Sequence, residues 1–124
     1  MTGTRVCVVV RRGRDVLAFE HPQAGLQLVK GRPEPGEGVA ATARRELFEE
    51  AGIRARRLRR RGWVPQLRWH LVEAWTGRLP DRWIHRCADD GGHDFAFRWH
   101  RLGTPAHGFH TVFRRVLDRV GTWP

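Results

Sequence analysis

The sequence contains few cysteines, few lysines and no long apolar segment. Only two cysteines occur, and neither belongs to a CxxC pair, which excludes zinc-finger and dithiol redox motifs. Cys7 lies in the apolar run 6–10, so we expect a buried small side chain there. In the absence of a secretory signal, no disulfide with Cys87 is expected. No apolar run approaches the roughly 20 residues that a membrane span requires, and we therefore expect a cytoplasmic protein with no membrane partner.

The charge of the chain is strongly unbalanced. Lys30 is the only lysine, yet the 23 basic residues exceed the 13 acidic ones and give a net charge of +10. A basic surface concentrates polyanions, so nucleotides, inositol phosphates and nucleic acids are candidate partners. The length of 124 residues, with 40% hydrophobic and 29% charged residues, predicts a single globular domain over residues 1–124.

Hydrophobic periodicity predicts a mixed fold. Alternating or continuous apolar runs predict strands over 5–12, 16–20, 26–30, 54–64, 67–75 and 94–102. Helical spacing predicts one helix over 39–51, ended by Gly52, and a second over about 109–120. The apolar stripe predicted for the first helix consists of Ala40, Ala43, Leu47 and Ala51. Strands on both sides of a central helix, followed by a closing helix, indicate the α/β class, here an α+β mixed sheet covered by helices.

Three carboxylates share one face of the first predicted helix. Glu46, Glu49 and Glu50 are three and four positions apart, so they project together, and like charges at this spacing repel. Arg45, four positions before Glu49, can supply one compensating charge, but negative charge remains in excess. Oxygen ligands gathered on a rigid support suit Mg²⁺. Because the carboxylates border the apolar stripe, we expect them at the rim of the core. The alternative is a solvated charged face.

The loop before this helix strengthens the metal-site interpretation. It is rich in glycine and proline, which lets the backbone approach a ligand closely, and the following helix N-terminus favours anions. Loop and helix together match the pattern G-x5-E-x7-R-E-U-x-E-E-x-G-U, where U is aliphatic. The nine matching residues are Gly31, Glu37, Arg45, Glu46, Leu47, Glu49, Glu50, Gly52 and Ile53. A chance match at one window has a probability on the order of one in a billion. The pattern is that of the Nudix box, and the chain resembles the Nudix hydrolases over residues 31–53 and in the order of its flanking strands.

The resemblance implies a Nudix-type α/β/α sandwich in which the box forms a loop–helix–loop. It implies Mg²⁺ or Mn²⁺ as cofactor, bound by the three glutamates 46, 49 and 50 and by the backbone carbonyl of Gly31. Arg45 would orient the glutamates, and Glu37 would brace the loop or bind metal through water. Gly52 would have a structural role within the motif.

The implied reaction is metal-dependent hydrolysis of a phosphoanhydride bond in a nucleoside diphosphate-linked or other polyphosphate, with Glu49 or Glu46 as general base. The substrate would be a small molecule such as a dinucleoside polyphosphate, or 5′-triphosphorylated RNA. The alternative is a catalytically silent nucleotide- or RNA-binding module on the same fold. A homodimer is one oligomeric state that the resemblance implies.

Residues around the box offer further candidates. Lys30 and Arg32 either contact distal phosphates or form a charged strand end. The segment 28–31 resembles members that act on dinucleoside polyphosphates or RNA ends, although those carry a proline where Val29 stands. The arginine-rich run 56–61 favours a solvated strand face over phosphate or RNA contact.

Many Nudix proteins use one more carboxylate from outside the box. Asp94 leads the candidates here because it begins the strand that contains Trp99, and Asp89, Asp90 and Glu73 follow. For each of them, the alternative is a solvated loop residue.

Overall fold

The structure is a computed structural model that describes residues 3–88 and 91–124. Its elements in chain order are β1 (Arg5–Arg12), β2 (Asp15–His21), β3 (Gly25–Gln27), β4 (Val29–Gly31), α1 (Val39–Ala51), β5 (Arg57–Val64), β6 (Trp69–Trp75), β7 (Trp83–Cys87), β8 (His93–Arg101) and α2 (Val112–Val120). The prediction of a mixed sheet with a central and a closing helix is confirmed. No helix in the described part of the chain is long and apolar enough to cross a membrane.

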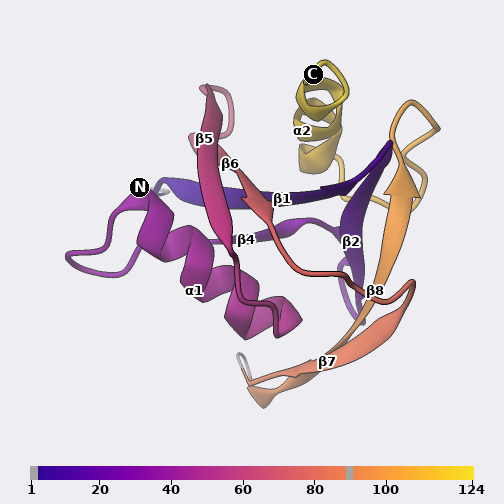
Figure 1. Cartoon of the computed structure of the whole chain (residues 1–124), viewed down its shortest axis with the longest axis horizontal. Coiled ribbons are helices and arrows are strands. Elements are labelled where there is room, and N and C mark those ends of the chain that lie inside the picture. The colour runs from indigo at the N-terminus through magenta and orange to yellow at the C-terminus, as the bar shows by residue number, and fades with distance from the viewer. Residues whose placement is uncertain (1–2, 89–90) are drawn as a thin grey trace.

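The strands form one mixed sheet with two halves. One half consists of β5, β6, β1 and β4, and the other of β3, β2, β8 and β7. The strand order is β5-β6-β1-β2-β8-β7, with β4 also paired to β1 and β3 also paired to β2. β1 and β6 run parallel over six residue pairs, whereas β1 and β2 pair only at their shared turn, through Arg11–Val16 and Arg12–Asp15. The two halves therefore splay apart away from that turn, as Figure 1 shows.

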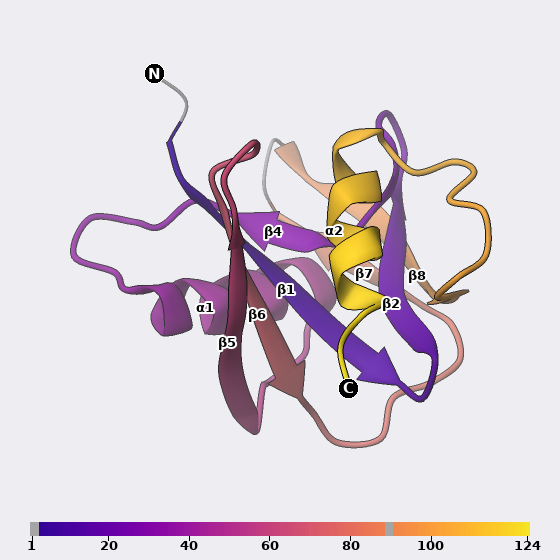
Figure 2. The same ribbon diagram turned by 90° about the horizontal axis from the view of Figure 1, so that it is seen from above.

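A helix covers each face of this sheet, which gives an α/β/α sandwich. α1 lies on the side of β7 and α2 on the opposite side (Figures 1 and 2). A hydrophobic core lies on each face of the sheet, and the apolar residues of β1 alternate between the two cores. Val6, Val8 and Val10 pack with α1, and Cys7 and Val9 pack with α2. The prediction that Cys7 is buried is confirmed, and burial raises the pKa of its thiol to about 12.

Some predicted elements were wrong in their limits. The single strand predicted over 26–30 is two strands, because the chain leaves its pairing with β2 at Gln27 and pairs with β1 from Val29. Leu28, between them, is fully buried in the α2 core. β5, β6 and α2 each begin two or three residues later than predicted.

Two further corrections concern the neighbourhood of α1. β7 was not predicted, although Trp83, His85 and Cys87 alternate with more exposed residues. Ala40, assigned to the apolar stripe, is exposed, and Thr42 and Glu46 are buried instead. Both polar side chains are hydrogen-bonded or ion-paired, which compensates their removal from water.

Candidate active site

The first glycine of the Nudix-like motif is fixed against the helix by the sheet. Gly31 ends β4 and pairs with Val6 of β1. A Cβ atom at Gly31 would overlap the carboxyl group of Glu46 on α1, so only glycine permits this approach. One residue earlier, the backbone N–H of Lys30 donates to Glu50 Oε1 at 3.0 Å. The strand therefore holds two of the three predicted glutamates beside the motif's loop.

The three glutamates of α1 form a carboxylate cluster, and Arg45 is the cation at its centre. Its Nη1 donates to Glu46 Oε1 at 2.6 Å and to Glu49 Oε2 at 3.2 Å, so the predicted compensation of Glu49 is present. Its Nη2 donates to the carbonyl of Arg32 at 2.8 Å, which ties the loop to the helix. The pKa of Arg45 is raised, chiefly by its hydrogen bond to Glu37.

Glu37 braces the loop. Its carboxylate accepts hydrogen bonds from Arg45 Nε and Nη2, both at 2.9 Å, from Thr42 Oγ1 at 2.8 Å and from the backbone N–H of Glu34 at 3.0 Å. The Arg45 hydrogen bond is the main reason that the pKa of Glu37 is lowered to about 2. The carboxylate is therefore saturated by the loop and by α1.

The carboxyl-terminal end of α1 is anchored by β7. His85 Nε2 lies 3.0 Å from the carbonyl oxygen of Glu49, and Trp83 Nε1 donates to that of Ala51 at 3.2 Å. Gly52 ends the helix in the left-handed conformation, with φ of 73°, as its predicted role requires. His85 and Trp83 were missed in the sequence, where only the alternation within 83–87 pointed to them.

The glutamates differ in their access to solvent. The Glu46 side chain is 9% exposed, whereas that of Glu49 is 38% exposed, and Glu50 has intermediate burial. The expected position at the rim of the core agrees with these values. The donor set is of the type that Mg²⁺ and Mn²⁺ prefer, and the close approach of Gly31 brings its backbone to the same carboxylates. However, no group of three or more His, Cys, Asp or Glu side chains in 3–88 and 91–124 is arranged to hold an ion, and Arg45 pairs with both Glu46 and Glu49.

A pocket of about 420 Å³ adjoins the cluster at Lys30. Arg5, Gln27 and His110 contribute polar groups to its lining, and Trp69 contributes an aromatic one. Burial lowers the pKa of Lys30, while the nearby Glu50 acts in the opposite direction. Lys30 therefore belongs both to the lining of this pocket and, through its backbone N–H, to the surroundings of Glu50.

The candidate carboxylates from outside the motif lie away from the carboxylate cluster. The side chain of Asp94 pairs with Arg86 at 3.2 Å, and both project from the face of β7 and β8 opposite to Cys87 and Phe95, which pack with α1. Glu73 is buried on the α2 side, between Arg11 and Arg61. Neither carboxylate is brought to the cluster, and Asp89 and Asp90 lie outside the described residues.

The other basic residues considered for phosphate contact do not gather at one site. Arg32 is exposed, and its carbonyl, not its guanidinium, takes part in the cluster. Within the run 56–61, most side chains are exposed, as expected for a solvated strand face, but Arg61 is an ion-pair partner of Glu73.

Comparisons with known proteins agree with this geometry. The family model described as the NUDIX domain matches residues 1–119, so the chain belongs to the Nudix family. Among solved structures, the MutT NUDIX hydrolase from Burkholderia pseudomallei is 19% identical, with a TM-score of 0.69 and coverage of 95% of this chain and 97% of that one. The Bacillus subtilis pyrophosphohydrolase BsRppH is 19% identical, with a TM-score of 0.66 and coverage of 96% and 78%. A structure described as ADP compounds hydrolase is also 19% identical, with a TM-score of 0.69 and coverage of 97% and 71%. No curated protein matches the sequence.

Proposed function

We propose that this protein hydrolyses a phosphoanhydride bond in a nucleotide-linked polyphosphate, with a divalent cation bound by Glu46, Glu49, Glu50 and the carbonyl of Gly31. The observation that carries the proposal is the carboxylate face of α1, which is held against Gly31 and against the backbone of Lys30, the residue that also lines the pocket. Structures of similar fold include proteins described as a pyrophosphohydrolase and an ADP compounds hydrolase.

Different residues of the chain have different roles in this reaction. A bound cation would neutralise phosphate charge and lower the pKa of a water molecule. Glu49 takes the proton from the attacking water, because it is the more exposed of the two candidate bases. Arg45 orients Glu49 and Glu46, and His85 fixes the backbone of Glu49. Since positioning and charge stabilisation dominate phosphoryl transfer, no covalent nucleophile is needed.

Substrate binding is assigned to the pocket at Lys30. Lys30 and Arg5 give this pocket a cationic wall, which favours phosphate groups. Its volume of about 420 Å³ lies within the range of small-molecule sites. A dinucleoside polyphosphate or a 5′-triphosphorylated RNA end would place its phosphates along this wall. We also propose the cytosol as the location, which cell fractionation would test.

A substrate panel with matched variants tests the proposal. Nucleoside triphosphates, nucleotide sugars, ADP-ribose, dinucleoside polyphosphates and triphosphorylated RNA would be incubated with the protein and Mg²⁺, and the products separated by chromatography. At least one substrate should be cleaved, and a chelator should stop the reaction. Glu49→Gln should lower the rate by roughly 10²- to 10⁴-fold. The control Glu20→Gln removes an exposed carboxylate on β2 and should leave the rate unchanged.

The alternative function is a silent binding module, for which the net charge of +10 provides support. Tight binding of single-stranded RNA without metal, together with no product from any panel member, would favour this function. Equal rates for Glu49→Gln and Glu20→Gln would also contradict the proposed reaction.

A further inference from the structure

A second pocket lies at the opposite end of β1 from the carboxylates. It measures about 470 Å³ and is lined by Val10 and Arg12 of β1, Ala74 of β6, Trp99 of β8 and the connection between β6 and β7. Gly31 pairs with Val6, whereas this pocket begins four residues further along β1, roughly 13 Å at the rise of a strand. It contains none of the motif residues.

The position of this pocket follows from the topology. β1 and β6 are parallel, with Val10 beside Ala74, and both strands end at the pocket. β6 then leads into the connection 76–82, and β8 lies across the gap on the other half of the sheet. The carboxyl ends of parallel strands, where neighbouring connections diverge, are a common location for ligand sites.

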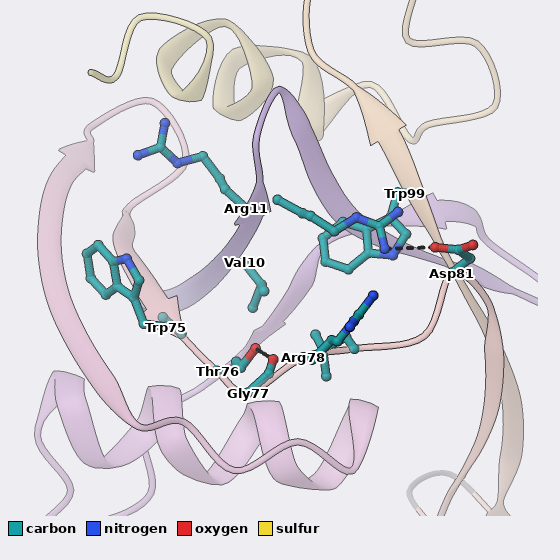
Figure 3. Close-up of a pocket in the computed structure, with 11 residues that line it drawn as sticks. Val10, Arg11, Trp75, Thr76, Gly77, Arg78, Asp81 and Trp99 are labelled. Carbon is teal, nitrogen blue, oxygen red and sulfur yellow. Dashed lines mark hydrogen bonds and ion pairs between the residues drawn. The ribbon is translucent and has the colours of Figure 1, made fainter.

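One wall of the pocket is built to receive an anion. The guanidinium of Arg12 stacks 4.3 Å from the centre of the Trp99 ring and donates from Nη1 to Asp81 at 2.9 Å, the contact drawn as a dashed line in Figure 3. Stacking leaves the edge of the guanidinium, with its remaining N–H donors, available in the plane. The Asp81 side chain is 89% exposed, so an incoming phosphate would replace this carboxylate at little cost.

Arg78 provides a second cation at the same wall. Figure 3 shows Arg78 on the Trp99 side of Val10, whereas the guanidinium of Arg11 points away from them. Arg11 is neutralised by Glu73, but Arg78 has no hydrogen bond or ion pair with any residue in the described ranges. Two forked donors on one wall match the oxygens of a single phosphate group.

The rest of the lining is apolar. Val10, Ala74 and Leu79 belong to the α1 core or pack against it, and they form the floor of the pocket. The face of the Arg12 guanidinium opposite Trp99 can stack on a flat ring. The volume of about 470 Å³ also exceeds what a phosphate ion alone would fill.

We propose that this pocket is a second binding site, separate from the carboxylate cluster, for a nucleoside monophosphate. The phosphate is held by Arg12 and Arg78, and the base stacks on Arg12 above the floor of Val10, Ala74 and Leu79. Binding at this site requires no metal and no hydrolysis.

Titration of adenosine 5′-monophosphate in the presence of a chelator tests this site, with calorimetry for affinity and the Trp99 indole N–H signal in NMR spectra for location. The wild-type protein should bind, and the Trp99 signal should shift. Arg78→Ala and Arg12→Ala should each weaken binding by about tenfold or more. The control Arg59→Ala removes an exposed arginine on β5 that lines neither pocket, and its affinity should equal that of the wild type. Adenosine alone and inorganic phosphate alone should bind more weakly than the nucleotide.

Two outcomes would overturn the proposal. One is no shift of the Trp99 signal up to millimolar nucleotide. The other is binding that Arg78→Ala leaves unchanged but Lys30→Ala removes, because that result would place the nucleotide beside the carboxylate cluster. Neither outcome depends on whether the protein hydrolyses a polyphosphate, so failure here is distinct from failure of the proposed function.

Discussion

Among single residues, Glu37 and Arg45 form the contact on which the loop before α1 depends. Two guanidinium nitrogens of Arg45 lie 2.9 Å from the two oxygens of Glu37. Both residues were identified from the motif, and the pairing of Arg45 with Glu49 was predicted from their spacing of four residues on the helix. The contact of Arg45 with Glu46 agrees with the implied role of Arg45 in orienting the glutamates. Its contact with the Arg32 carbonyl was not predicted, because it depends on how the irregular loop 31–38 folds back on the helix.

The Glu37–Arg45 contact predicts an acid-stable ion pair. The pKa of Glu37 is about 2 in the folded protein, below its ordinary value of 4.5. A lowered pKa means that the stabilisation is complete above the ordinary pKa and is lost as the pH falls through about 2. An NMR titration of the Glu37 carboxyl carbon should find its midpoint there. In Arg45→Gln the midpoint should move up toward the ordinary range, and an unchanged midpoint would contradict this account of the loop.

The contact of Gly31 with Glu46 predicts a strong effect of one added methyl group. A Cβ atom in Gly31→Ala would overlap the Glu46 carboxyl group, so either the strand or the helix must move. We expect a loss of about 1–3 kcal/mol in the free energy of unfolding and a fall in hydrolytic rate. The control Gly62→Ala, where a Cβ would meet nothing within 4 Å, should be nearly neutral. Equal losses in urea denaturation of the two variants would contradict the predicted overlap.

At the level of elements, α1 was predictable and its anchor was not. The apolar spacing of 39–51 and the terminal Gly52 defined both limits of the helix. β7 was missed because its five residues are stabilised by tertiary contacts with α1, where Trp83 and His85 bind the last helical carbonyls. The break at Leu28 was missed for a similar reason, since the change of pairing partner is a tertiary event.

Removal of the contacts that β7 makes with the end of α1 should destabilise that end locally, without unfolding the whole protein. His85→Ala removes the ring nitrogen beside the Glu49 carbonyl, and Trp83→Phe removes the indole donor but keeps an aromatic ring to stack on Phe97, now 4.9 Å away. Each should cost about 0.5–1.5 kcal/mol. Hydrogen exchange should accelerate in the last turn of α1 and stay unchanged in β1. Exchange that rises equally in both elements would show a global effect and refute a local anchor.

For the whole molecule, a buried ionic cluster joins the half-sheet β5-β6-β1 to the residues after α2. Glu73 is 3% exposed and pairs with Arg11 at 2.7 Å and with Arg61 at 3.1 Å. Both guanidinium groups lie over the ring of Trp123, that of Arg11 at 5.5 Å and that of Arg61 at 4.5 Å from its centre. In the sequence, Glu73 was a candidate for the site and Arg61 one of a charged run. Arg61 lies in the bulge between Arg60 and Gly62, close to the Arg59–Glu73 pair of the β5–β6 ladder.

This cluster predicts a large contribution to stability. Glu73→Ala leaves two poorly solvated arginines without their carboxylate and should lower the free energy of unfolding by about 3–5 kcal/mol. Asp94→Ala, which breaks the exposed pair with Arg86, is the matched control and should change it by about 1 kcal/mol or less. Urea denaturation of the two variants measures both values. Similar losses would show that burial of the Glu73 cluster adds nothing.

The central claim is that the glutamates on one edge of α1 bind a divalent cation. Electron paramagnetic resonance of Mn²⁺, titrated with protein, measures this directly through the fall of the free-ion signal. The account predicts that the wild-type protein removes Mn²⁺ from solution, that Glu20→Gln does the same, and that Glu46→Gln and Glu50→Gln leave the ion free. Equal uptake by all four proteins, or no uptake by the wild type even with a pyrophosphate-containing ligand, would contradict it.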